Sequence, residues 1–301
     1  MFKTASQWLL TALWAVSSSA ISQSIVVEHP LGTTTLPTQP SRVVVLGMDA
    51  LDVMDYLEIE PIGVVKRPMP DYLTKYQAER YVSVGTLHEP DFETIYTLKP
   101  DLIIVSNRST PAYDELSKIA PTVAFTVDAR QFWLSTQIAW RMMGKLFQQQ
   151  AAIERIIKAT EERITAIQQR ALAENAQALM VMANGDNITT FGAGSRYDAI
   201  FNEFGFKEIV DNDETAAHGD LISYEFIAEA DPDYLLVMDR DKAIGRESGT
   251  AKKGFSNELI KQTKAAKNGR ITELNPQAWY ISASGITATE IMIKDITMAL
   301  E

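Results

Sequence analysis

Two arginines occupy matching positions in a repeated segment of the chain. Arg108 and Arg240 are 132 residues apart, and each lies three residues past the end of a predicted strand. A third arginine, Arg196, follows a small-residue turn at 192–195, a type of turn that lets the backbone approach a ligand. An arginine stays charged, donates hydrogen bonds in a planar fork and stacks on aromatic rings. Three arginines converging on one site would therefore suit a multiply charged anion with flat faces.

A histidine and a tyrosine add metal-binding chemistry to this set. His218 lies in a loop-like segment, and Tyr280 opens a small-residue loop before the last predicted helix. A phenolate is a good ligand for a hard metal, and iron(III) would depress the phenol pKa, which is normally about 10. Each residue also has a structural interpretation. Trp279 and Tyr280 could form an aromatic pair that closes the core, and His88 is an alternative to His218.

The repeat extends well beyond the two arginines. Residues 91–105 align without gaps to residues 223–237 at the constant offset of 132. Each copy predicts a short helix that begins at a glutamate, Glu93 or Glu225, followed by a Pro-Asp turn and a strand. Common α/β patterns could produce such a unit twice by chance, but matching glutamates and matching arginines are harder to explain that way. We interpret the repeat as two homologous lobes.

The elements around the repeat predict where these side chains point. In residues 23–143, short β-rich runs such as 43–46 and 62–65 alternate with helical ones, and the alternation resumes in residues 176–301. Such alternation indicates mostly parallel α/β sheets, which bind ligands beyond the carboxyl ends of their strands. The expected fold is therefore two Rossmann-like α/β lobes with the ligand cleft between them.

One long helix is predicted between the lobes, and we assign it to residues 144–175. Residues 132–175 contain no proline, and their one glycine is Gly144. Isoleucines recur at helical spacing from residue 146 onward, which predicts a helix of about 30 residues. A sustained heptad pattern is missing, so the helix is expected to connect the lobes and not to form a coiled coil.

The first 22 residues have the character of a secretory signal peptide. Lys3 precedes an apolar run at 8–16, and small residues at 18–20 offer a cleavage site. The chain contains no cysteine, so the expected mature protein has neither disulfides nor a lipid anchor at that site. This combination predicts a protein that is free in a Gram-negative periplasm.

Composition narrows the possible functions. The formal charge of −11 argues against nucleic acid as a partner, because no basic stripe is evident. With three histidines, the sequence shows no site rich in histidine and carboxylates for direct zinc or manganese binding. A secreted hydrolase is a weak alternative, because the run that ends at Ser195 and Arg196 has the wrong order for a nucleophile elbow.

Over essentially the whole mature chain, the sequence resembles the siderophore-binding proteins of ABC importers. Its general marks are the segments 93–105 and 225–237, which binders of siderophores, haem and cobalamin share. A more specific set of residues is similar to the subgroup that binds iron catecholates: Arg108, Arg196, His218, Arg240 and Tyr280. The resemblance implies two lobes joined by one long helix, a ferric siderophore as cargo, no intrinsic cofactor and no catalysis.

The resemblance also implies a role for each of these residues. The three arginines surround the catecholate rings, while His218 and Tyr280 complete the iron coordination when the siderophore offers two catechols. Glu93 and Glu225 match acidic residues, one in each lobe, that dock on arginines of the membrane permease. Charge supports the catecholate, since a ferric tris-catecholate carries three negative charges, whereas hydroxamate complexes are nearly neutral. Hydroxamates, haem and cobalamin stay open as alternative ligands, and we expect a monomer whose lobes move little on binding.

Overall fold

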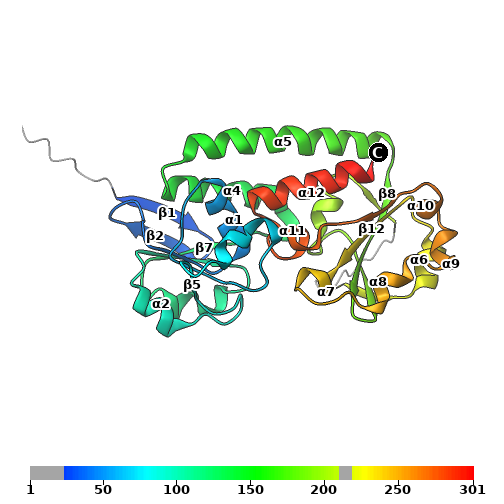
Figure 1. Ribbon diagram of the computed structural model, residues 1–301. Coiled ribbons are helices and arrows are strands. Elements are labelled where there is room, and N and C mark those ends of the chain that lie inside the picture. Colours follow the sequence, from blue (N-terminus) through cyan, green and yellow to red (C-terminus); the bar gives the residue numbers. More distant parts are fainter. Residues whose placement is uncertain (1–23, 210–218) are drawn as a thin grey trace, which may run out of the picture.

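Two α/β lobes lie side by side, and one long helix, α5 (Gln150–Ala173), runs along both of them (Figure 1). The structure is a computed structural model that describes residues 24–209 and 219–301. The predicted two-lobe α/β architecture is confirmed.

The N-terminal lobe is built on a parallel sheet of five strands in the order β5-β4-β3-β6-β7. Counted along the chain, this is the doubly wound order 3-2-1-4-5, which reverses direction between β3 and β6. The strands are β3 (Val43–Val45), β4 (Gly63–Val64), β5 (Val82–Ser83), β6 (Leu102–Ser106) and β7 (Thr122–Phe125).

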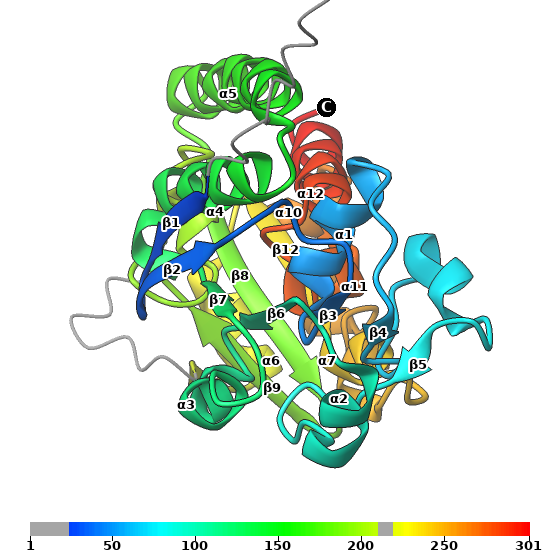
Figure 2. The same cartoon turned by 90° about the vertical axis from the view of Figure 1, so that its left-hand side faces the viewer.

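Helices and a hairpin complete this lobe. The hairpin of β1 (Ile25–His29) and β2 (Gly32–Leu36) packs against α4 (Figure 2). The other elements are α1 (Met48–Tyr56), η1 (Asp71–Gln77), α2 (Phe92–Leu98), η2 (Thr110–Ala112), α3 (Tyr113–Leu116), η3 (Ala129–Gln131) and α4 (Phe132–Leu146).

The C-terminal lobe has a mixed sheet in the order β11-β9-β8-β12-β13, with β10 paired to β8. Strands β8 (Gln177–Asn184), β12 (Tyr234–Asp239), β13 (Ile271–Glu273) and β10 (Lys207–Glu208) are parallel. Strand β9 (Asn187–Phe191) runs in the opposite direction, so it pairs antiparallel with both β8 and β11 (Asp220–Ile222). This lobe therefore departs from a fully parallel Rossmann sheet. Its helices are η4 (Asp198–Ile200), α6 (Tyr224–Ala230), α7 (Arg240–Ala243), α8 (Thr250–Gly254), α9 (Glu258–Lys261), α10 (Lys264–Lys267), α11 (Pro276–Tyr280) and α12 (Ile286–Ala299).

The repeated segments form the same helix–turn–strand unit in each lobe. Helices α2 and α6 begin after side-chain caps, Asp91 and Ser223, whose oxygens accept from backbone N–H groups of the first turn. Both helices end at a residue with left-handed backbone, Lys99 (φ 47°) and Asp231 (φ 43°). The strands that follow, β6 and β12, each pair with a neighbouring strand on both sides.

The single helix expected at 144–175 is in fact the end of one helix and the whole of another. Helix α4 ends at Leu146, and α5 begins at Gln150 and spans 24 residues. The turn between them places Gln148 at a φ of 57°. Gly144 permits the close approach of the two helices, because a Cβ there would lie 2.9 Å from Cγ1 of Ile153. The turn has no glycine or proline of its own, so composition did not reveal it.

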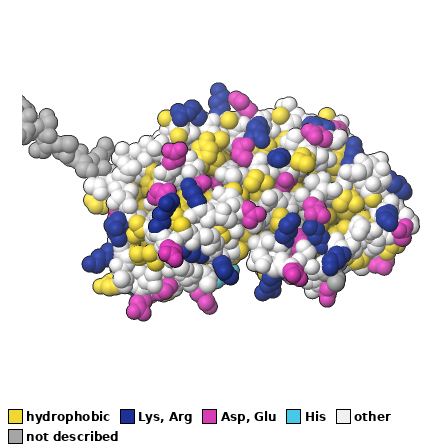
Figure 3. Space-filling model, viewed as in Figure 1, with side chains coloured by type: hydrophobic (Ala, Val, Ile, Leu, Met, Phe, Trp, Pro, Cys, Tyr) yellow, Lys and Arg dark blue, Asp and Glu magenta, His cyan; other side chains and the backbone are white. Residues whose placement is uncertain are grey.

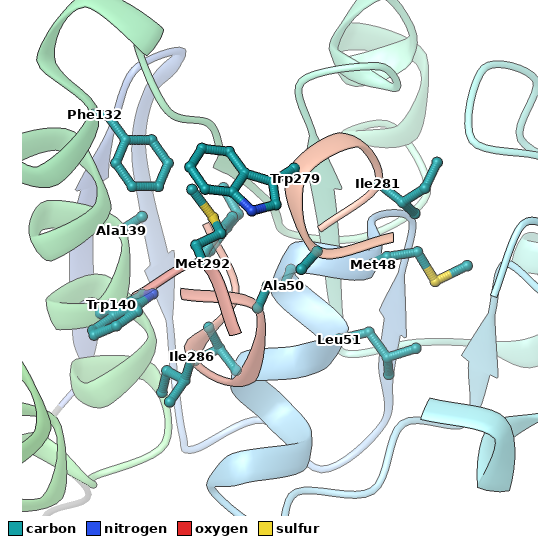
Figure 4. Close-up of a cluster of buried hydrophobic side chains, with 14 of the residues drawn as sticks. Met48, Ala50, Leu51, Phe132, Ala139, Trp140, Trp279, Ile281, Ile286 and Met292 are labelled. Carbon is teal, nitrogen blue, oxygen red and sulfur yellow. The ribbon is translucent and has the colours of Figure 1, made fainter. Parts of the chain in front are cut away.

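The last part of the chain returns to the N-terminal lobe. Helix α12 packs against α1 and α5, and Figure 4 shows Trp279, Ile286 and Met292 among buried side chains of α1 and α4. Trp140 donates its indole N–H to the carbonyl of Ser284 at 2.7 Å. One continuous hydrophobic core therefore joins the two lobes.

A buried carboxylate holds the start of α12. Asp52 of α1 is fully buried and accepts from the backbone N–H groups of Thr287 at 3.0 Å and Ala288 at 2.8 Å. Glycine is needed beside it, because a Cβ at Gly285 would lie 2.1 Å from Oδ2 of Asp52. This contact links the first helix of the described chain to its last.

Candidate functional site

A cavity of about 440 Å³ lies between the lobes. Figure 3 shows the surface indented between them, on the side away from α5. Both lobes contribute lining residues, and several of these, such as Arg108 and Arg240, follow the carboxyl ends of strands. The lining consists of Asp49, His88, Asn107, Arg108, Val127, Ala129, Phe132, Arg196, Ala199, Arg240, Trp279, Tyr280, Ile281, Ala283, Ser284 and Met292. This is the location expected for ligands of α/β sheets, here at the edge where β3 and β6 end.

Arg108 enters the cavity from the loop after β6. Its Nη2 donates to the backbone carbonyl of Tyr280 at 2.7 Å, so it contacts the opposite lobe. Burial and the neighbouring charge of Arg196 lower the pKa of Arg108, although a guanidinium remains protonated at any physiological pH. The cavity thus contains a desolvated positive charge, which interacts more strongly with an anion than an exposed one would.

Arg240 begins α7, directly after β12. Its Nε donates to the phenol oxygen of Tyr280 at 2.9 Å, and Nη1 donates to the side-chain carbonyl of Asn184 at 3.0 Å. Asn184 ends β8, the strand beside β12, so the sheet itself fixes the orientation of the guanidinium.

Arg196 comes from the small-residue turn after β9. Gly194 has a φ of +79°, and Gly192 lies so close to Glu208 that a Cβ would meet its carboxylate at 1.6 Å. The turn therefore requires these glycines. Arg196 itself is exposed, and its guanidinium carbon lies 4.2 Å from the centroid of the Tyr280 ring.

Tyr280 is at the centre of the three arginines. The guanidinium carbons of Arg108 and Arg240 lie 5.4 and 5.7 Å from the ring centroid. Burial raises the pKa of Tyr280, but the hydrogen bond from Arg240 and the three positive charges outweigh burial, so the pKa falls below its usual value. A phenol that ionises more readily is a better ligand for a hard metal ion.

The two aromatic residues at 279 and 280 therefore have different positions. Trp279 is buried at 3% exposure, and its indole N–H donates to Asp295 at 3.0 Å, while Tyr280 is half-buried and faces the cavity. The structure brings Arg108, Arg196, Arg240 and Tyr280 together. His218 lies outside the described residues.

Sequence reasoning missed Asp49, a carboxylate that lines this positive cavity. Its Oδ1 accepts from the Ser106 hydroxyl at 2.6 Å and from the backbone N–H of Ala50 at 2.8 Å. Burial raises its pKa, and the bond from Ser106 and the charge of Arg108 act in the opposite direction. Asp49 lies shortly after the strand at 43–45, and a position just after a strand end was the signal that identified Arg108, so the same signal could have identified Asp49.

Glu93 and Glu225 lie away from the cavity. Both are exposed in the first turns of α2 and α6, in opposite lobes (Figure 1). A hydrogen bond from its own backbone N–H, with a second from Ser223, lowers the pKa of Glu225. These carboxylates thus occupy equivalent, solvent-accessible positions on the two lobes.

No group of three or more histidine, cysteine or carboxylate side chains among residues 24–209 and 219–301 is arranged to hold a metal ion. Over the same residues, no helix is long and apolar enough to cross a membrane. Among its described lining residues, the cavity offers three guanidinium groups, one phenol, one imidazole and one carboxylate.

Comparison with known proteins gives consistent matches over nearly the whole chain. Residues 43–278 match the family described as periplasmic binding proteins. The chain is 36% identical over 288 residues to the petrobactin-binding protein YclQ of Bacillus subtilis, which covers 94% of this chain and 90% of that protein. It is 34% identical over 277 residues to the ferric-anguibactin-binding protein FatB of Vibrio anguillarum, covering 90% of this chain and 86% of FatB.

A solved structure agrees with this assignment. The periplasmic catecholate-siderophore binding protein VctP from Vibrio cholerae is 47% identical, with a TM-score of 0.88 over 92% of this chain and 100% of VctP.

Proposed function

Because the chain belongs to the periplasmic binding protein family, we propose that it captures ferric catecholate siderophores and delivers them to an inner-membrane ABC permease for iron uptake. The observation that carries this proposal is the convergence of Arg108, Arg196 and Arg240 on the Tyr280 ring inside an interlobe cavity. The names of the relatives, which include a petrobactin binder and a catecholate-siderophore binder, support the same cargo class.

The arginines supply both charge and shape complementarity. A ferric tris-catecholate carries three negative charges delocalised over flat rings, and three guanidinium groups neutralise and stack on such a surface. Of the three arginines, Arg108 should attract the anionic siderophore most strongly, because its burial strengthens electrostatic attraction. This role is capture without chemical change of the cargo, so no catalytic residue is assigned and no resident cofactor is needed.

We further propose that Tyr280 and His218 ligate iron when the siderophore offers two catechols. Two catechols leave two positions of an octahedral iron open, and the charges around Tyr280 favour the phenolate that would fill one of them. His218 would supply the other ligand as an imidazole. The cargo thus brings its metal, and the protein completes the coordination.

Docking on the permease is proposed for Glu93 and Glu225. Their equivalent, exposed positions on the two lobes suit a pair of basic contacts on a transporter. Reversal of both charges to lysine should abolish uptake while the affinity for the siderophore stays intact. Unimpaired uptake by the double variant would contradict this assignment. The proposed working form is a monomer, free in the periplasm after removal of the leader predicted at residues 1–22.

The test is a tryptophan-fluorescence titration of the mature protein with ferric bis-catecholate, ferric tris-catecholate, ferric citrate and a ferric hydroxamate. Tight quenching by both catecholates, with weak or no response to the others, is the expected result. His218→Ala and Tyr280→Phe should each weaken the bis-catecholate at least about tenfold, a loss of roughly 1.4 kcal/mol, and spare the tris-catecholate. A preference for citrate or the hydroxamate would reject the proposed cargo.

A further inference from the structure

A second, smaller cavity adjoins the main one and is called the side cavity here. Its volume is about 210 Å³, and it shares with the main cavity the lining residues His88, Arg108, Arg240, Tyr280 and Ile281. Its other lining residues come from two loops of the N-terminal lobe and from the residue that follows α7: Arg67, Pro68, Thr86, Leu87 and Ile244. The two cavities are therefore adjacent parts of one interlobe cleft.

The sheet order explains why the cleft extends in this direction. The main cavity is lined by residues that follow β3, β6 and β7, such as Asp49, Arg108 and Val127. Arg67, which lines the side cavity and not the main one, follows β4, and His88, which lines both cavities, follows β5. Because the strands lie in the order β5-β4-β3-β6-β7, the side cavity extends the cleft toward the other half of the same carboxyl edge.

The lining of the side cavity is positive. It contains the guanidinium groups of Arg67, Arg108 and Arg240, and no carboxylate is among its described lining residues. Arg108 and Arg240 already donate to Tyr280. Arg67 is exposed, and among residues 24–209 and 219–301 it has no hydrogen-bond or ion-pair partner. Its guanidinium donors are thus available to an incoming anion, at a site where the chain's net negative charge is locally reversed.

We propose that the side cavity binds an anionic, oxygen-bearing arm of the cargo, with Arg67 as its forked donor. The inference rests on the proposed function. The volume of the side cavity is about half that of the main cavity, 210 against 440 Å³. That space suits one arm of the cargo, such as a carboxylate or one catecholate ring. Both kinds of arm present paired oxygens to a guanidinium, which binds them bidentately. Two groups of a siderophore could supply such paired oxygens: a third catecholate, or a carboxylate on the siderophore backbone.

The experiment compares three ferric complexes built on one linker: a bis-catecholate, the same bis-catecholate with a free carboxylate arm, and a tris-catecholate. The protein variants are Arg67→Gln and, as a matched control, Arg155→Gln, which removes the same charge from an exposed position on α5. Arg67→Gln should weaken binding of an armed complex about tenfold, the scale of a charge-assisted bidentate contact, and leave the armless one within about twofold. Arg155→Gln should change none of them.

The outcomes separate this inference from the proposed function. Loss confined to the carboxylate or to the tris-catecholate identifies which arm the side cavity takes, and loss with both supports the shared chemistry. Equal effects of Arg67→Gln on all three complexes, or no effect on any, overturn the role of the side cavity while the proposed function stands. Failure of the wild-type protein to bind any complex rejects the proposed function and this inference together.

Discussion

At the scale of single residues, position relative to strand ends was the strongest sequence signal. Arg108 and Arg240 were predicted from their matching places after β6 and β12, and both line the cavity. Arg67 follows the run at 62–65, which was predicted as a strand and is β4, so the same rule could have found it. His88 was named as an alternative to His218, but the two-residue strand β5 before it leaves too weak a pattern to show that its loop faces the cleft. The hydrogen bond from Arg240 to Tyr280 could not be predicted at all, because it depends on how the two segments meet in space.

The environment of Tyr280 leads to a spectroscopic prediction. Burial raises the pKa of Tyr280, but the hydrogen bond from Arg240 and the three guanidinium charges lower it by more than burial raises it. Tyr280 should therefore ionise at a lower pH than an ordinary tyrosine. Burial raises the pKa of Tyr72, Tyr197 and Tyr234, which should therefore titrate later. In an ultraviolet pH titration of phenolate absorbance, we expect an early step equivalent to one tyrosine.

Two variants assign that step. Tyr280→Phe should remove it, and Arg240→Gln should move it to higher pH, because the hydrogen bond and one positive charge are lost. An early step that persists in Tyr280→Phe would show that another tyrosine is responsible.

At the scale of elements, the sequence predicted the repeated helix–strand units and the connecting helix, but not where that helix begins. The isoleucine pattern was informative because Ile153, Ile157, Ile164 and Ile167 are all buried. The turn before Gln150 was not predicted, because Gln148 has a left-handed backbone conformation, which glutamine rarely adopts. The crossing of α4 and α5 depends on the space left by Gly144, which is a property of the folded pair.

The contact between α1 and α12 leads to a prediction about stability and pH. Burial raises the pKa of Asp52 to about 7, and the N–H groups of Ala288 and Thr287 act against that rise. The unfolded chain releases this proton near pH 4, so the folded state binds more protons between about pH 4 and pH 7. The contribution of Asp52 to the free energy of unfolding is therefore full at low pH and falls across this window, by at most about 1.4 kcal/mol per pH unit.

Asp52→Asn removes the titrating group and keeps an oxygen that can accept from the start of α12. We expect the free energy of unfolding of the variant, measured in urea relative to the wild type, to improve steadily from pH 4 to pH 7. A difference that is constant over this range would show that Asp52 does not titrate there in the folded protein. Asp114→Asn, at an exposed position on α3, is a suitable control for the general loss of a carboxylate.

At the scale of the whole molecule, two lobes around a cleft were predictable, but the return of the last helix was not. The α/β alternation after residue 176 gave no reason to separate α12 from the other C-terminal elements. The structure packs α12 on α1 and α5, and its core is continuous between the lobes. Contacts of this kind depend on the packing of segments far apart in the chain, which local patterns do not encode.

This shared core predicts a small change of shape on binding. Wide hinge closure would have to break apolar contacts between α12 and both lobes, so loading should cause small local adjustments. Small-angle scattering of the empty and the siderophore-loaded protein should give nearly equal radii of gyration. A large decrease in the radius of gyration on siderophore binding would contradict the proposal that the shared core holds the two lobes in place.

A two-lobe structure that changes little on binding also affects how iron uptake depends on the amount of siderophore. With the proposed docking through Glu93 and Glu225, empty and loaded molecules present nearly the same outer surface to the transporter. Empty molecules then occupy transporters without delivering cargo, so they act as competitors of the loaded ones. Uptake should therefore depend on the fraction of the protein that is loaded as well as on its amount, and overproducing the protein when siderophore is scarce should slow iron entry.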